Sequence, residues 1–212
     1  MKDLSEKERK IAQHLIIDDG FEKACEAMGF FVKENVTFAK TVIEGTEEMR
    51  FHTDVQKRTE HTHFTLLSTE LIGEIKGACY LLFTHEETME LLNVVLPKSI
   101  LNDQSKMLTM RDAILLEIDN IISASVITHF SNKLGFKMYG GVPQLRFVNM
   151  DELNNIITAS LVPDKVLMGF KACFQTSKKG FAPEFIWSLA PEFYQGIVKY
   201  TNVLETLAKE AL

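Results

Sequence analysis

The sequence predicts an α+β domain in which long helices pack on an antiparallel sheet. Segments with the period of a helix alternate with short apolar segments typical of strands, and the order helix, strands, helix occurs twice. The 212 residues are 46% hydrophobic, which suffices for a real core and excludes a wholly disordered chain. We therefore expect one domain over residues 1–212, built from two repeats at about 21–97 and about 107–200.

The first half of the chain is expected to contain three helices and several strands. A capping-box pattern at residues 5–8 predicts a first helix reaching to about residue 16, and a second helix follows over 21–28. A third helix is expected to begin at Thr84 and to end before Pro97. Between the second and third helices, apolar runs predict strands at 36–44, 49–55, 64–67 and 71–83.

A polar stretch at residues 98–106 separates the two halves. The longest periodic segment follows, and it predicts a helix over 109–134 that ends at Gly135. A last helix is expected to carry Val198, Val203, Leu204 and Leu207. A faint echo between residues 76–80 and 171–174 supports the duplication. Strands are expected at 136–139, 142–147, 156–161, 166–176 and 181–189.

Charge and cysteine content restrict the class of protein. The chain has 23 basic and 29 acidic side chains, a net charge of −6, so we expect no nucleic-acid partner. Its apolar runs are too short to predict a membrane span, and the charged first residues predict no signal peptide. Three scattered cysteines predict a reduced, cytoplasmic protein. His61 and His63 share a strand face, but without a third ligand we expect no metal site.

One stripe of the long helix carries the candidate site. At about 100° per residue, most large apolar side chains of this helix cover one broad arc. Glu117 and Asn120 lie together on the opposite stripe, between the small residues Ala113 and Ala124. A solvated stripe usually carries long charged side chains, whereas the alanines leave room for another molecule. The pattern therefore indicates a carboxylate and a carboxamide exposed for contact, with an ordinary solvated stripe as the alternative.

These residues resemble the signature of the CheC/CheX/FliY family of chemotaxis phosphatases. That signature is an Asp or Ser, three residues, Glu, two residues, Asn, twenty-two residues and Pro. Glu117, Asn120 and Pro143 match it in type and spacing. The chain departs from it at Ala113, which stands at the Asp-or-Ser position, and at Asp119, which replaces a usual Gly and falls on the apolar arc without an obvious partner.

The second helix resembles a degenerate copy of the same motif. Glu26 aligns with the glutamate, but Gly29 stands where the asparagine belongs, and His52 stands in place of the proline. By this resemblance the chain is similar to the one-site members of the family, such as CheX. A CheC-like fold with an internal duplication is the implied architecture.

The resemblance also implies an activity and a partner. The expected activity is hydrolysis of the aspartyl phosphate on a CheY-like response regulator, with Glu117 and Asn120 as the catalytic pair. The expected cofactor is none of its own, because the Mg²⁺ would belong to the partner receiver domain. CheX-like members form dimers, so a homodimer is also expected. The alternative, which Ala113 and Asp119 favour, is a binding module of the same fold that sequesters a phosphorylated receiver or another signalling protein.

Overall fold

The computed structural model describes residues 19–43, 63–160, 166–177, 180–181, 183–190 and 192–210. The helices in this part of the chain are α2 (Gly20–Val32), α4 (His85–Val95), α5 (Lys98–Leu101), α6 (Gln104–Leu134), α7 (Met150–Ser160) and α8 (Glu192–Glu210). The strands are β1 (Thr37–Ile43), β2 (Phe64–Gly73), β3 (Gly77–Thr84), β4 (Met138–Gly140), β5 (Gln144–Val148), β6 (Val166–Gln175), β7 (Gly180–Phe181) and β8 (Glu184–Leu189).

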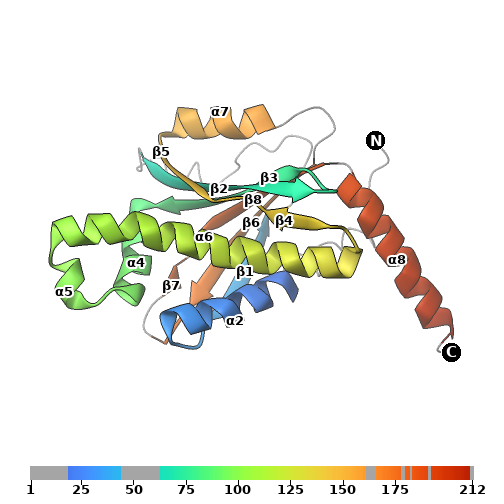
Figure 1. Cartoon of the computed structure of the whole chain (residues 1–212), viewed down its shortest axis with the longest axis horizontal. Helices are drawn as coiled ribbons and strands as arrows, with labels where there is room; N and C mark the ends of the chain where they lie inside the picture. The colour runs from blue at the N-terminus through green and yellow to red at the C-terminus, as the bar shows by residue number, and fades with distance from the viewer. Residues whose placement is uncertain are drawn as a thin grey trace.

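The described strands form one antiparallel sheet. Its order is β1-β6-β8-β3-β2-β4, and β5 also pairs with β2 while β7 pairs with β6. Helices α2 and α6 cover one face of the sheet and α7 lies on the other, while α8 extends away from the body of the molecule (Figure 1). The predicted α+β class, with long helices on an antiparallel sheet, is therefore confirmed.

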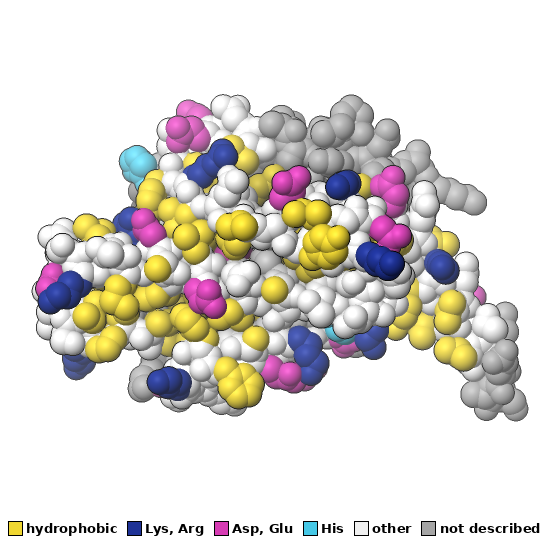
Figure 2. Space-filling model, viewed as in Figure 1, with side chains coloured by type: hydrophobic (Ala, Val, Ile, Leu, Met, Phe, Trp, Pro, Cys, Tyr) yellow, Lys and Arg dark blue, Asp and Glu magenta, His cyan; other side chains and the backbone are white. Residues whose placement is uncertain are grey.

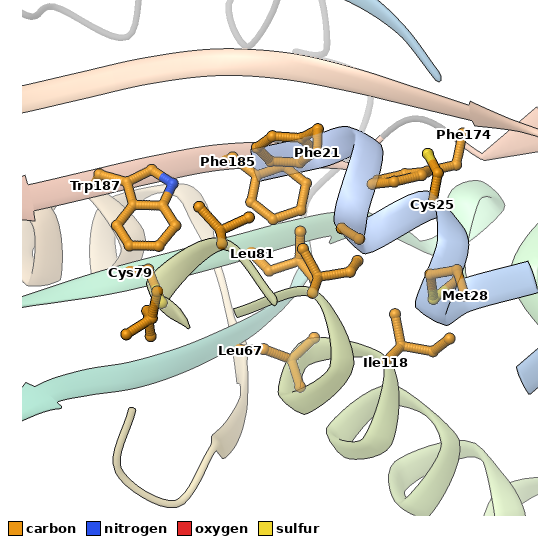
Figure 3. Close-up of a cluster of buried hydrophobic side chains, with 14 of the residues drawn as sticks. Phe21, Cys25, Met28, Leu67, Cys79, Leu81, Ile118, Phe174, Phe185 and Trp187 are labelled. Atoms are coloured by element: carbon orange, nitrogen blue, oxygen red, sulfur yellow. The ribbon is translucent and has the colours of Figure 1, made fainter. Parts of the chain in front are cut away.

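Alternate side chains of the strands build a separate core on each face of the sheet. On the α6 face, the buried strand residues Leu67, Leu81, Phe185 and Trp187 belong to one large cluster, to which α2 and α6 also contribute (Figure 3). On the other face, a smaller cluster joins the strand residues to α7 and contains Phe64, Leu66, Tyr80, Leu82, Val148, Leu153 and Ile186. The larger cluster fixes α6, which carries the candidate site.

Both ends of α6 are set by local sequence. At its start, the Asp103 side chain accepts a hydrogen bond from the backbone N–H of Lys106, and at its end Gly135 adopts a left-handed φ of 73°. The helix begins at Gln104, five residues before the predicted start. Among the described helices, α6 is the one long and apolar enough to cross a membrane, but its apolar residues Leu115, Ile118 and Ile122 are buried in the core.

Several predicted elements differ from the structure. The single strand expected at 181–189 is wrong, because the structure has β7 at 180–181 and β8 at 184–189, which pair with different parts of β6. The strand expected at 156–161 is wrong, because residues 150–160 form α7. Reciprocal hydrogen bonds between Asn149 and Glu152 cap the start of this helix. The single strand expected at 71–83 is also wrong, since β2 ends at Gly73 and β3 begins at Gly77. Part of the polar stretch at 98–106 is helical, as α5. The helix expected at 5–16 and the strand at 49–55 lie outside the described residues.

The strand order has the form that two related halves would produce. With β5 taken as the strand beside β2, the order is β1-β6-β8-β3-β2-β5. If β1, β2 and β3 of the first half correspond to β5, β6 and β8 of the second, exchanging the corresponding strands gives the same order from the opposite edge. In that arrangement the first strand of each half pairs with the other half, as β1 does with β6 and β5 with β2. The echo between residues 76–80 and 171–174 lies on β3 and β6, which do not occupy matching places. The duplication itself stays a prediction.

Candidate functional site

Glu117 and Asn120 lie on the outer surface of α6. Both residues are exposed, whereas Leu115 and Ile118 on the opposite side of the helix are fully buried. Residues three apart on a helix lie about 60° from each other around its axis, so the carboxylate and the carboxamide face the same side. Within the described residues, neither side chain forms a hydrogen bond or an ion pair. The two polar groups are therefore available to another molecule.

The surface around this pair is apolar and contains small residues. Ala113 and Ala124 are exposed, one turn before Glu117 and one turn after Asn120. Met110, seven residues before Glu117 and on the same side of α6, is a large hydrophobic residue with an exposed fraction of 39%, whereas Leu108, 42% exposed, lies on the opposite side of the helix from Glu117. Hydrophobic side chains gather over the end of α6 that adjoins α5 (Figure 2). A partner that contacted the pair along this helix would also cover apolar surface.

Strand β5 adds an aromatic side chain beside the first turns of α6. The ring of Phe147 is half exposed, and the Arg111 guanidinium lies 4.5 Å from its centroid. Arg111 Nε also lies 2.8 Å from Asp112 Oδ1, which orients the guanidinium. Pro143 is half-buried in the short connection between β4 and β5, both of which pack against α6. The motif proline therefore lies in a connection beside the helix that carries Glu117 and Asn120.

Asp119 has buried partners, so the expectation that it lacks one is wrong. Its carboxylate is almost fully buried between α6 and the sheet. Thr69 Oγ1 on β2 donates to Oδ2 at 2.6 Å, and Ser123 Oγ, one turn along α6, lies 3.4 Å from Oδ1. Burial raises the pKa of Asp119 to about 6, although the hydrogen bonds from Thr69 and Ser123 act in the opposite direction. A titratable carboxyl group therefore lies directly behind the exposed pair.

A buried thiol completes this polar cluster. Cys79 Sγ on β3 lies 3.3 Å from Ser123 Oγ and donates to the backbone carbonyl of Thr69 at 3.6 Å. Burial, together with the nearby Asp119 carboxylate, raises the pKa of this thiol far above its usual value. Cys79 is therefore a neutral hydrogen-bonding group in the core and is unsuited to act as a nucleophile.

The second helix holds the two residues of the predicted degenerate copy. Glu26 is exposed and pairs with Lys23 at 2.8 Å, one turn earlier. Gly29 lies in the last turn of α2, where a Cβ would stand 3.0 Å from the carbonyl oxygen of Glu34. A side chain at this position would press on the backbone that ends the helix. The geometry thus gives a physical reason for glycine where the motif has asparagine.

Other polar side chains give no second catalytic cluster in the described part of the chain. Its His, Cys, Asp and Glu residues include no group of three or more that could hold a metal ion. His63 is exposed, and His61 lies outside the described residues. His129, on the inner side of α6, places Nε2 3.6 Å from Asp19 Oδ2 at the start of α2. This contact joins α6 to the start of α2, and both helices cover the same face of the sheet.

The contacts that α6 makes with distant residues were not predicted from the sequence. The hydrogen bond between Ser123 and Asp119 could have been predicted, because side chains four residues apart on a helix lie close enough to bond. Thr69 precedes Asp119 by fifty residues, and no local pattern joins them. The position of Arg111 over Phe147 likewise depends on how β5 packs beside α6.

This chain resembles known proteins in its three-dimensional structure. No protein-family model matches the sequence, and no curated protein matches it. The fold is that of the CheC/CheX/FliY chemotaxis proteins, so the resemblance found in the sequence is confirmed as a shared fold. A one-site, CheX-like character stays a prediction.

In particular, the chain is similar to FliY from Thermotoga maritima, with a TM-score of 0.64 at 13% identity over 94% of this chain and 98% of that one. The CheX–CheY–BeF₃–Mg²⁺ complex from Borrelia burgdorferi gives 0.50 at 15% identity, over 82% and 97%. The FliM middle domain from Vibrio alginolyticus gives 0.50 at 11% identity, over 87% and 99%. At sequence identities this low, the structural similarity shows a common fold and nothing finer.

Proposed function

We propose that this protein stimulates hydrolysis of the aspartyl phosphate on a CheY-like response regulator. The observation that carries the proposal is the exposed pair Glu117 and Asn120 on α6. Both polar groups face outward from a hydrophobic helix, and within the described residues they have no intramolecular partner. Two further facts support it: the chain has the fold of CheX, and a CheX has been solved in complex with CheY.

Asn120 is the residue suited to orient the attacking water. An acyl phosphate is intrinsically reactive, so catalysis requires mainly a water in line with the phosphorus and stabilisation of the charge that spreads over the phosphoryl oxygens. A carboxamide oxygen accepts a proton from that water while the amide group donates. This arrangement works without a titrating group, which suits a side chain on an open surface.

Glu117 is the residue suited to hold the regulator in register. Its carboxylate is an acceptor for a lysine ammonium, and the proposed contact is the lysine beside the phosphoryl group of the receiver. The Mg²⁺ of the reaction would be bound by the receiver itself. The protein would therefore contribute positioning, through one carboxylate and one carboxamide, and the receiver would contribute the metal and the reacting group.

The surroundings of the pair support docking of a whole protein domain. Met110 is partly exposed on the same side of α6 as Glu117, two turns nearer to α5, and Ala113 leaves this side open to close approach. Phe147 on β5 is exposed beside the first turns of α6. An interface combines such an apolar centre with a few polar contacts that set orientation. By resemblance, the proposal includes a cytoplasmic location and a homodimer.

The two roles can be separated with alanine variants of the pair. Asn120→Ala should abolish stimulated dephosphorylation while largely retaining affinity for the phosphorylated receiver, because only the water contact is lost. Glu117→Ala should weaken both. The measurements are phosphoryl decay and the concentration of protein that gives half-maximal stimulation. Asn93→Ala is a matched control, since Asn93 is an exposed helical asparagine on α4. Decay as fast with Asn120→Ala as with the wild type would contradict the assignment.

A second candidate function is a binding module that sequesters a phosphorylated receiver or another signalling protein. Ala113 favours it, because the family signature has an Asp or Ser there and this side chain offers no polar group. Substoichiometric protein distinguishes the two functions. Accelerated decay with repeated turnover supports the phosphatase, whereas protection of the phosphoryl group, or an effect that requires equimolar protein, supports the binding module.

A further inference from the structure

The carboxylate of Asp119 joins α6 to the sheet at a point directly behind the exposed pair. Thr69 Oγ1 on β2 lies 2.6 Å from Oδ2, a short and directional contact between the helix and the strand. Ser123 Oγ lies 3.4 Å from Oδ1 and belongs to the same helix. Among the described residues, no cationic side chain contacts this carboxylate. A buried acid is thus held by hydroxyl groups alone.

This contact has a direct geometric effect on Asn120. Successive residues on an α-helix lie 100° apart around its axis, so a side chain fixed at position 119 determines where position 120 faces. Two other polar contacts join α6 to the sheet: Ser123 Oγ lies 3.3 Å from the Cys79 thiol, a weak hydrogen-bonding group, and Arg111 lies over Phe147 in the first turns of the helix. The remaining contacts are mainly apolar side chains, whose attraction depends on buried area and has little directionality. The Thr69–Asp119 hydrogen bond is therefore the feature best suited to fix the rotation of α6 next to the site.

We propose that Asp119 is a positioning residue: by accepting the hydrogen bond from Thr69, its ionised carboxylate fixes the direction in which Asn120 and Glu117 face the partner. This inference rests on the proposed function for its effect on catalysis, but its structural part is independent. It assigns a role to a buried acid that the chemistry of the exposed pair does not use.

The protonation state of Asp119 changes this hydrogen bond. As an anion, the carboxylate accepts from both hydroxyl groups. Once protonated, its own O–H needs an acceptor, so one hydroxyl must rotate or lose its bond. The groups that face Asp119 are Thr69 on β2, Ser123 on α6 and Cys79 on β3. The thiol stays neutral over this range because its pKa is strongly raised. Histidine side chains ordinarily titrate in the same range, so a transition of Asn120 near pH 6 belongs to Asp119 when Asp119→Asn abolishes it.

Nuclear magnetic resonance tests the structural part without any partner. The side-chain amide signals of Asn120 should shift with pH with a midpoint near 6 in the wild type and should lose this transition in Asp119→Asn. The amide of Asn93, which donates to the carbonyl of Met89 on α4, is the internal control. An Asn120 signal that shows no transition near pH 6, or the same transition in Asp119→Asn, would overturn the proposal.

A pair of threonine variants tests the effect on catalysis. Thr69→Val removes the hydroxyl but keeps the shape, whereas Thr69→Ser keeps the hydroxyl. We expect Thr69→Val to lower the stimulated rate roughly 3- to 10-fold with unchanged affinity, and Thr69→Ser to remain near wild type. Equal rates for the two variants would overturn the catalytic role. If the wild type itself gives no stimulation while Asn120 titrates as described, the proposed function fails and the positioning of Asn120 by Asp119 stands.

Discussion

Asp119 is a residue whose charge acts against the stability of the fold. Its carboxyl group is buried, and burial raises its pKa from 3.8 to about 6. The folded state therefore binds this proton more tightly than the unfolded state does. At neutral pH the folded protein must keep an anion in its interior with only hydroxyl donors beside it. A neutral side chain of the same size would avoid this cost, which is consistent with a functional reason for the acid.

The stability of the protein should depend on pH through Asp119. Asp119 contributes most favourably below its unfolded pKa, near 3.8, and this contribution is lost as the pH rises to about 6. The shift corresponds to about 3 kcal/mol. Urea unfolding of the wild type and Asp119→Asn should therefore show a difference that grows in favour of the variant from pH 4 to 6 and is then constant. A difference independent of pH would contradict this assignment.

The exposed pair illustrates what the sequence can predict at the scale of residues. Helical periodicity alone placed Glu117 and Asn120 on the outer stripe of α6, because the apolar arc of one helix is a local property. The partners of Asp119 required knowledge of how α6 packs on β2. Hydrogen bonds between residues fifty positions apart depend on tertiary structure, so this part of the site was not predictable.

At the scale of elements, local end signals predicted helices better than apolar runs predicted strands. Thr84 and Glu87 form a complete capping box at the start of α4, and Gly135 ends α6 as expected. The apolar run that begins at Ile156 resembled a strand. However, Asn149 and Glu152 form reciprocal hydrogen bonds that cap the start of a helix, and Ile156 lies in that helix. Apolar composition does not distinguish a buried strand from a helix, whereas a cap does.

Two glycines with positive φ provide a prediction at this scale. Gly73 ends β2 with a φ of 121°, and a Cβ there would lie 2.1 Å from the carbonyl oxygen of Lys137, where β2 meets β4. Gly135 ends α6 with a φ of 73°, and no atom would lie within 4 Å of its Cβ. Gly135→Ala should cost about 1 kcal/mol of unfolding free energy. Gly73→Ala should cost more than about 3 kcal/mol, since backbone atoms must move. Equal losses in urea unfolding would contradict the close approach of β2 and β4.

At the scale of the whole molecule, α6 presents the site on the sheet face that it covers together with α2. The central strands β8 and β3 lie side by side, although they come from opposite halves of the chain. The order of elements predicted the class of fold, but it could not predict this pairing. Strand order depends on contacts between the halves, and no local signal in either half specifies them.

The exposed ring of Phe147, beside the first turns of α6, provides a prediction about docking. Phe147→Ser should raise the concentration of protein needed for half-maximal stimulation by roughly 10-fold, because the loss of an exposed aromatic side chain weakens an interface. The rate at saturation should stay the same. Phe30→Ser is the comparison variant, since Phe30 is an exposed phenylalanine on another element, α2. An unchanged half-maximal concentration with Phe147→Ser would show that the partner does not bind beside Phe147.

The proposed phosphatase activity depends on the carboxamide of Asn120, which would promote attack on an aspartyl phosphate in another protein. The most direct test measures phosphoryl decay in a several-fold molar excess of phosphorylated receiver, with the wild type and with Asn120→Asp. The variant keeps the size of the side chain but loses the amide donor. We predict repeated turnover by the wild type and decay at the spontaneous rate with the variant. Equal decay with both proteins would contradict the claim.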